Sequence, residues 1–337
     1  DVPETIDDWY TVLTAFKKKG VKSPLALERG IINQGYLVNA FASAYGTSLK
    51  RFFIEDGKVK FSAVQPGYKE LLTLLSKWYT EELINIDFPT HNFEDNIKKM
   101  AVTGEAGAWF AHLSHIRIIK DLEGGKDPNF KIEPVPFPLL EKGKELKLGP
   151  TSYHLGSQSI FISAKSKYPV EIIKFHDYIY SPEGHELVTW GVEKNKTYTV
   201  VDGKHQFTEF ITNNPDGLSY DIARRKYTLA DMTGAWDWDL EEPQYSLPEQ
   251  KKASEVWKVA DTSGVMPAAM TMTQDEGRRF STIMAEVETY IEEKFIKFVM
   301  GIEQLDKFDE FVAQVESMNI EEAINIQQAA LDRYIAR

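Results

Sequence analysis

Four groups of aromatic and polar residues stand where predicted loops meet the starts of predicted helices. A sugar presents flat apolar faces edged by hydroxyl groups. A protein that binds one therefore needs aromatic rings for stacking and amide, carboxylate or imidazole groups for the edges. Both kinds of group occur in Gln34 with Tyr36, Trp109 with His112, Tyr153 with His154, and Trp236 with Trp238. These groups favour a sugar-binding site, although any of the aromatic rings could instead pack in a core or cover a surface.

The sequence contains none of the short catalytic or nucleotide-binding signatures. It has no Walker loop, no G-x-G-x-x-G, no G-x-S-x-G elbow and no H-E-x-x-H. Paired carboxylates for glycoside hydrolysis depend on distance in space and not on spacing along the chain. A glycoside hydrolase or lyase therefore stays open as an alternative, but we predict a binding protein without catalytic residues.

The candidate metal ligands are sparse. There is no cysteine, and of the seven histidines only His112 and His115 have helical spacing, without a supporting third ligand. Oxygen ligands for Ca²⁺ could come from the acidic loop Asp237, Asp239, Glu241 and Glu242. That loop lacks the spacing and the glycine of an EF-hand, so we interpret it as solvated. We predict no metal and no cofactor.

Length and charge limit the class of protein. A chain of 337 residues with 42% hydrophobic content can form two moderate cores, which favours two lobes. The formal net charge of -12 argues against a nucleic-acid partner, because phosphate binding needs clustered Lys and Arg. No apolar stretch approaches the roughly 18 residues that a membrane-spanning helix needs.

Helix signals recur along the chain. Thr5 and Asp8 form a capping-box pattern, and Lys17 to Lys19 followed by Gly20 indicate the end of that helix. Apolar periodicity predicts a helix over residues 65–83, and others are expected over 92–102, from 114 or 115 to 124, over 169–180 and from 181. Beyond residue 247 the pattern is helical, with breaks near 266, 301 and 319, and predicts three or four helices.

Strand signals are short. Asp-Gly at residues 56–57, between apolar segments, predicts a surface β-hairpin over 51–62. Residues 106–110 and 159–163 are predicted to be buried strands. The prolines of residues 134–138 indicate an extended connector, and residues 141–147 an exposed loop. Short strands alternating with longer helices indicate an α/β fold with a largely parallel sheet.

Several segments together resemble the family 1 extracellular solute-binding proteins, the class of maltose-binding protein. They occur in the same order along essentially the whole chain: PETIDD at 3–8, GY at 35–36, AYG at 44–46, DGK at 56–58, GEAGAW at 104–109, SAKS at 163–166 and SPEG at 181–184. Distal segments resemble the large lipoprotein receptors of Gram-positive bacteria: YTVVDG at 198–203 and EEAINIQQAALDRY at 321–334.

The resemblance implies a two-lobe, type II periplasmic-binding-protein-like fold. It places residues 1–156 in the main part of lobe two and residues 157–247 in the returning part of lobe one. Residues 248–337 would be helices that pack mostly on lobe two. The family begins with a signal peptide and the first βα units of lobe one, so we expect this chain to be a fragment that lacks them.

The resemblance also implies a function. The chain would be the non-catalytic receptor of an ABC importer, a monomer that closes on a carbohydrate, expected to be an oligosaccharide, and delivers it to membrane permease subunits. The protein would be an extracellular lipoprotein anchored to the cell surface. A peptide or another polar solute is the main alternative ligand.

Site residues follow from the matched positions. Tyr36 matches a ligand-stacking tyrosine of the sugar-binding members, and Trp109 lies close to a ligand-stacking tryptophan. Gln34 stands near the position at which those members use an acidic group, so the same sugar is not implied. Residues 266–279 match a ligand-facing loop and helix start. Within that segment Asp275, Glu276 and Arg279 either contact ligand or are solvated.

Overall fold

A computed structural model describes residues 2–29, 39–49, 52–144, 148, 160–229, 247–257, 263–267 and 269–337. The chain divides into two compact units. Unit 1 comprises Asp1–Ser152 and Lys252–Arg337, and unit 2 comprises Tyr153–Lys251. The predicted boundaries at residues 156 and 247 lie close to these, and the assignment of the units to lobes stays a prediction. No helix in the described ranges is both long and apolar enough to cross a membrane.

Unit 1 opens with the predicted capped helix. α1 (Ile6–Lys18) begins where Thr5 Oγ1 accepts a hydrogen bond from the Asp8 amide at 3.1 Å. The Asp8 carboxylate in turn accepts from the Thr5 amide at 3.1 Å, which completes the capping box. The chain then continues into β1 (Ser23–Ala26), whose four residues are buried.

The predicted hairpin is present, but its apolar side is buried. β2 (Phe52–Glu55) pairs antiparallel with β3 (Lys58–Phe61). Asp56 and Gly57 make the turn with φ of 52° and 75°, the left-handed region in which glycine is favoured. The Val59 amide donates to the Gln328 side chain at 2.7 Å. The expectation of a surface hairpin was therefore wrong for this side, because a C-terminal helix covers it.

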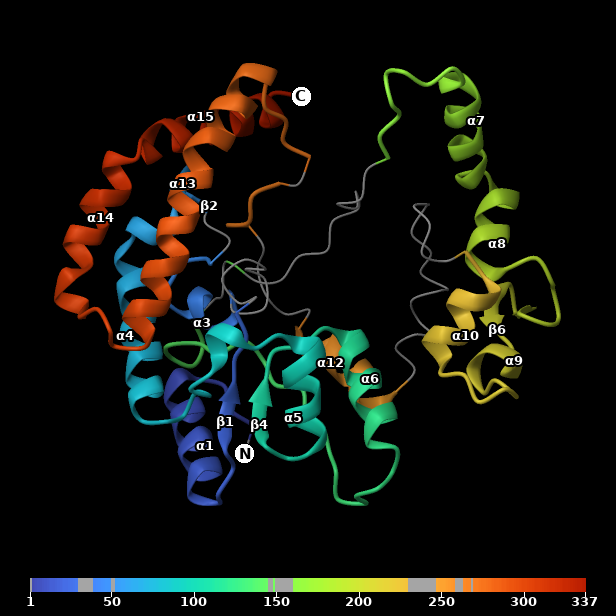
Figure 1. Ribbon diagram of the computed structural model, residues 1–337, viewed down its shortest axis with the longest axis horizontal. Coiled ribbons are helices and arrows are strands. Elements are labelled where there is room, and N and C mark those ends of the chain that lie inside the picture. Colours follow the sequence, from blue (N-terminus) through green and yellow to red (C-terminus); the bar gives the residue numbers. More distant parts are fainter. Residues whose placement is uncertain are drawn as a thin grey trace. The chain divides into compact units, whose positions relative to one another are not determined.

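Helices form most of unit 1. They are α3 (Asn39–Ala44), α4 (Pro66–Thr80), α5 (Lys98–Val102), α6 (Leu113–Glu123), α12 (Pro248–Trp257), α13 (Gln274–Val299), α14 (Phe308–Ser317) and α15 (Ile320–Ile335), of which α12 begins in unit 2 and ends in unit 1. The apolar faces of α3, α4, α13, α14 and α15 meet in one large core, whereas Ala101 of α5 and Ile119 of α6 belong to a smaller cluster. Of these, α4 packs against α13, and α13 packs against α15 (Figure 1). Trp78 of α4 and Phe298 of α13 are completely buried in the core that these helices share. In the part of the chain after Leu247 that the structure describes, α12, α13, α14 and α15 confirm the expected helical region.

A short parallel sheet lies beside this core. β1 pairs in parallel with β4 (Ala106–Trp109), with Ser23 opposite Ala106 and Ala26 opposite Trp109. On its other side Leu25 makes an isolated parallel bridge to Ile84. The other two strand pairs in the described ranges are antiparallel hairpins. We expected a largely parallel sheet, and in the described ranges its parallel pairing consists of β1 with β4 and of this bridge.

Unit 2 is smaller. Its elements are α7 (Pro169–Ile179), α8 (Pro182–Trp190), β5 (Tyr198–Val201), β6 (Lys204–Phe207), α9 (Glu209–Thr212) and α10 (Tyr220–Tyr227). The core consists of Trp190, Tyr198, Phe207 and Ile211. The Ser181 hydroxyl accepts from the Gly184 amide at 3.1 Å, which confirms the predicted start of α8.

The predicted buried strand over residues 159–163 was wrong. Residues 160–163 form no strand, and Phe161 is 90% exposed. A strand needs a partner for its backbone hydrogen bonds and a surface on which to bury its side chains. Within the described residues this segment has no strand partner, so its β propensity is not realised.

Candidate functional site

The candidate site lies where β1 and β4 end. Because the two strands are parallel, their carboxyl ends lie at the same edge, and the following residues leave the sheet there. In parallel α/β sheets this edge is where ligands bind. The residues at this edge that could meet a ligand are Glu28, Phe93, Trp109, His112 and His115, which we call the strand-end site.

A buried asparagine holds the segment that follows β1. The Asn85 side-chain oxygen accepts from the Leu27 amide at 2.6 Å, and its nitrogen donates to the Leu27 carbonyl at 3.0 Å. The same nitrogen lies 3.0 Å from His91 Nδ1. The Arg29 amide donates to the His91 carbonyl at 2.9 Å. Glu28 therefore sits between two residues whose backbones are hydrogen-bonded to the neighbouring segment.

Glu28 carries a half-buried carboxylate. The Phe93 amide donates a hydrogen bond to it, which favours the charged form. Burial has the larger, opposite effect and raises the pKa of Glu28, and the negative charge of Glu94 raises it slightly further. A carboxylate has about four lone-pair positions, so one backbone donor leaves capacity for further donors.

Phe93 connects Glu28 to the histidines of α6. It begins a π-helical turn (Phe93–Ile97), and its ring stacks on that of His115 with a centroid distance of 3.6 Å and an interplanar angle of 15°. The His112 amide points at His115 Nδ1 at 3.4 Å, and the two imidazole rings meet edge to face at 4.9 Å. Glu28 and these two imidazoles are thus linked through one phenylalanine.

Both imidazoles are held in the neutral form. Burial lowers the pKa of His115 to about 4, helped by the neighbouring His112 and by Lys98. The His112 side chain reaches the surface, but the protein around its ring also lowers its pKa. A neutral imidazole has one donor and one acceptor nitrogen, the combination that binds hydroxyl groups, and in His115 the acceptor Nδ1 already faces the His112 amide.

Trp109 is the last residue of β4 and is partly buried. Its ring packs against a hydrophobic cluster that includes Phe93, Ile97 and Ile119. The ring is thus anchored in a core on one side while the residue keeps some exposure. Its role as a platform for a ligand stays a prediction.

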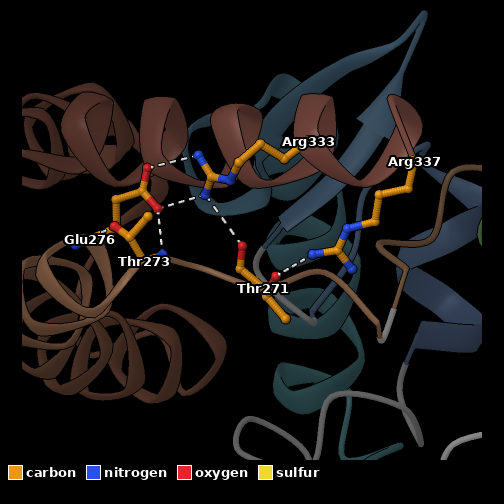
Figure 2. Close-up of polar contacts among 5 residues, drawn as sticks. All are labelled: Thr271, Thr273, Glu276, Arg333 and Arg337. Carbon is orange, nitrogen blue, oxygen red and sulfur yellow. Dashed lines mark hydrogen bonds and ion pairs between the residues drawn. The ribbon is translucent and has the colours of Figure 1, made fainter.

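Glu276 and Arg279 lie at the start of α13 and are already engaged in ion pairs. Glu276 accepts two hydrogen bonds from the Arg333 guanidinium, at 3.0 and 2.6 Å, and one from the Thr273 amide at 2.7 Å (Figure 2). Arg279 makes a bidentate contact with Glu322, at 2.8 and 2.6 Å. Both side chains thus connect α13 to α15, while Asp275 is exposed. A role for these three residues in ligand contact stays a prediction.

The other predicted site residues lie outside the described residues: Gln34, Tyr36, Tyr153, His154, Trp236 and Trp238. The acidic loop with Asp237 and Asp239 lies outside them as well. Within the described ranges no group of three or more His, Cys, Asp or Glu side chains could hold a metal ion.

Glu28, Asn85 and Phe93 were missed by the sequence analysis. A signal existed, because the apolar run Pro24-Leu25-Ala26-Leu27 follows the end of the first helix and is followed by charged residues. That pattern is typical of a strand in a βα unit. Asn85 and Phe93 carry no comparable signal, since their roles depend on contacts across the fold.

Comparison with known proteins gives a family match. Residues 1–186 match the model for "Bacterial extracellular solute-binding protein". Lipoprotein LipO of Bacillus subtilis (strain 168) is 30% identical over 257 residues, which cover 69% of this chain and 49% of that protein. The chain therefore spans about half the length of this curated relative.

Solved structures of similar fold include an alginate-binding protein, AlgQ2, with a TM-score of 0.78 and 22% identity over 98% of this chain and 68% of that chain. An HMO-binding, ABC-transporter-associated protein from Bifidobacterium longum infantis has a TM-score of 0.74 and 16% identity, over 99% and 71% of the two chains. The substrate-binding protein FusA of S. pneumoniae, in complex with kestose, has a TM-score of 0.74 and 17% identity, over 100% of this chain and 69% of that chain.

These structural similarities confirm the predicted two-lobe, periplasmic-binding-protein-like fold, here mixed α/β and mostly helical. The match to the family model covers more than half of the 337 residues. The chain therefore belongs to the family of bacterial extracellular solute-binding proteins.

Proposed function

We propose that this protein is the solute-binding component of an ABC importer and that its ligand is a carbohydrate, specifically an oligosaccharide. The observation that carries the proposal is the strand-end site, where an indole and two neutral imidazoles follow the carboxyl ends of parallel strands. In support, the structures that share the fold are described as binding alginate, HMO and kestose.

The proposed mechanism is capture without chemistry. The Trp109 ring would stack on an apolar sugar face, and His112 and His115 would exchange hydrogen bonds with hydroxyl groups. A wrong stereoisomer would leave some of these groups unpaired, which is the source of selectivity. Closure of two lobes on the ligand, recognition by permease subunits, a monomeric state and an extracellular lipoprotein location belong to the same proposal.

The test is a titration of the protein with a panel of mono- and oligosaccharides. Tryptophan fluorescence and the thermal shift are measured at each sugar concentration. We expect a saturable change with at least one sugar. Trp109→Phe keeps an aromatic ring in the cluster but reduces the stacking area, so it should weaken binding several-fold. His112→Ala should also weaken binding.

A matched control is Trp257→Phe, which also removes one tryptophan. Trp257 lies on α12, where its indole nitrogen donates to the Val135 carbonyl at 2.9 Å, and it is not part of the strand-end site. Its substitution should leave sugar affinity unchanged. A protein that responds to a peptide panel and to no sugar would contradict the carbohydrate proposal, and turnover of an oligosaccharide would contradict the non-catalytic one.

A further inference from the structure

Glu28 differs from the other members of the strand-end site because its side chain is a carboxylic acid. Its place is set by the backbone around it, through the hydrogen bonds of Leu27 to Asn85 and of Arg29 to His91. Its carboxylate is held by the Phe93 amide. The charge therefore stands at a defined point of the strand edge, two residues beyond the end of β1.

The positive charges next to Glu28 are already paired. Arg29 contacts Glu292 of α13 at 2.9 Å, and Lys98 at the start of α5 pairs with Glu94 of the preceding π-helical turn. The imidazoles of His112 and His115 are neutral at neutral pH because their pKa values are lowered. Among the described residues of the strand-end site, Glu28 is thus the one acidic side chain.

The Glu28 carboxylate would act differently on neutral and on anionic sugars. A partly buried carboxylate accepts hydrogen bonds from hydroxyl groups and repels a second carboxylate, and low local polarity strengthens both effects. A neutral sugar supplies hydroxyl donors, whereas a uronate sugar brings a negative charge to the same edge. The whole chain, with a formal net charge of -12, adds to the repulsion.

We propose that Glu28 contacts the ligand and selects neutral, hydroxyl-rich oligosaccharides against anionic ones. The proposal rests on the proposed carbohydrate-binding function and adds to it a specificity-determining residue and a ligand class.

The experiment uses calorimetric titration of the protein with two sets of probes. One set is neutral, a series of di- to tetrasaccharides that includes kestose, and the other consists of alginate oligosaccharides of the same length. The variant is Glu28→Gln, which keeps the size and the Phe93 hydrogen bond but removes the charge. We expect the wild type to prefer a neutral probe, and the variant to bind that probe at least tenfold more weakly and to discriminate less against alginate.

The matched control is Glu105→Gln. Glu105 directly precedes β4, at the opposite end of the strands, and pairs with Lys22 at 3.1 Å on the surface. This variant loses the same charge from the whole chain, so unchanged affinity and selectivity are expected. Equal loss in both variants would show an effect of total charge and would contradict the role of Glu28.

The outcomes separate the two proposals. If the wild type binds a neutral probe and Glu28→Gln binds it equally well, the role of Glu28 is wrong and the sugar-binding function stands. If the wild type prefers the alginate probes, the proposed selection is likewise wrong while the function stands. If the wild type binds no probe in either set, the carbohydrate function fails and the role of Glu28 fails with it.

Discussion

At the scale of single residues, His115 has an unusual environment. Its ring is stacked on Phe93 and contacts His112, and burial lowers its pKa to about 4 from an ordinary value of 6.5. Such a residue influences stability as well as ligand contact, because the unfolded chain does not share its environment.

The sign of the His115 effect follows from proton binding. Between about pH 6.5 and pH 4 the unfolded chain binds a proton at this position and the folded protein does not. The free energy of unfolding therefore falls as the pH is lowered through this window. His115→Phe keeps the stack on Phe93 but cannot bind a proton. Between pH 7 and pH 5 its free energy of unfolding should therefore fall by about 2 kcal/mol less than that of the wild type.

Urea denaturation of both proteins at pH 8, 7, 6 and 5 measures this difference. Glu28, whose raised pKa acts in the opposite direction, is present in both proteins and cancels in the comparison. At pH 8 neither form of His115 is charged, so the two curves there give the baseline effect of the substitution itself. Parallel pH profiles would contradict the lowered pKa of His115.

Two helical glycines provide a second residue-scale prediction. A Cβ on Gly67, in the first turn of α4, would lie 2.2 Å from the Tyr45 carbonyl oxygen, whereas a Cβ on Gly277 of α13 meets nothing within 4 Å. We expect Gly67→Ala to cost about 2 kcal/mol because backbone must move. Gly277→Ala should add about 0.5 kcal/mol through its helix propensity. Urea denaturation measures both changes. A change of the same sign in the free energy of unfolding of the two variants would contradict this account.

At the scale of elements, ion pairs connect the start of α13 to α15. The Arg333 guanidinium joins Glu276 and also donates to the Thr271 carbonyl at 3.3 Å, and Arg337 donates to the Thr271 hydroxyl at 2.8 Å (Figure 2). These contacts hold the segment before α13 against the last helix. Arg279 makes a simpler contact, to Glu322 alone among the contacts described.

This difference predicts unequal effects of two similar substitutions. Arg333→Gln should lower the melting temperature more than Arg279→Gln and should speed amide hydrogen exchange in residues 269–273, because it removes the contacts to both Glu276 and the Thr271 carbonyl. Exposed ion pairs are weakened by salt, so the gap between the two variants should narrow in 1 M NaCl. Equal exchange rates over residues 269–273 in the two variants would show that Arg333 does not hold this segment.

At the scale of the whole molecule, the two units differ in how they treat apolar side chains. Unit 1 buries most of them in a large continuous core. In unit 2, exposed apolar side chains gather on and around α7, including Phe161, Tyr168, Val170, Ile173, Phe175 and Tyr180. Within the described residues, α7 packs against α8 and buries Ile179, but most of its apolar side chains stay exposed.

This exposure predicts tolerance to polar substitution. Ile173 is 58% exposed and Phe175 is 56% exposed. Changing both to Gln should alter the free energy of unfolding by less than about 1 kcal/mol in total. It should also reduce the binding of an apolar dye, because less apolar surface remains exposed. As a control, Ile211→Ala in the core of unit 2 should cost about 3 kcal/mol. A large loss in the double variant would mean that α7 is covered in solution.

The sequence by itself determined the local structure. The capping box of Thr5 and Asp8, the Asp56-Gly57 turn and the serine start of α8 depend on contacts within a few residues, so residue types suffice to predict them. The family segments also occur in the expected order along the chain, and this order led to the correct family and fold.

Tertiary structure decided what those elements do. Residues 159–163 have the composition of a buried strand, but strand formation needs a partner that sequence periodicity does not reveal. Glu28 reaches Phe93 across 65 positions of sequence, and Asn85 reaches Leu27 across 58. Such contacts arise only when distant segments share a sheet edge, because no local pattern carries information about which segment will lie alongside. For that physical reason Trp109 and His112 could be predicted from the sequence, whereas Glu28 and Phe93 joined the strand-end site only in the folded chain.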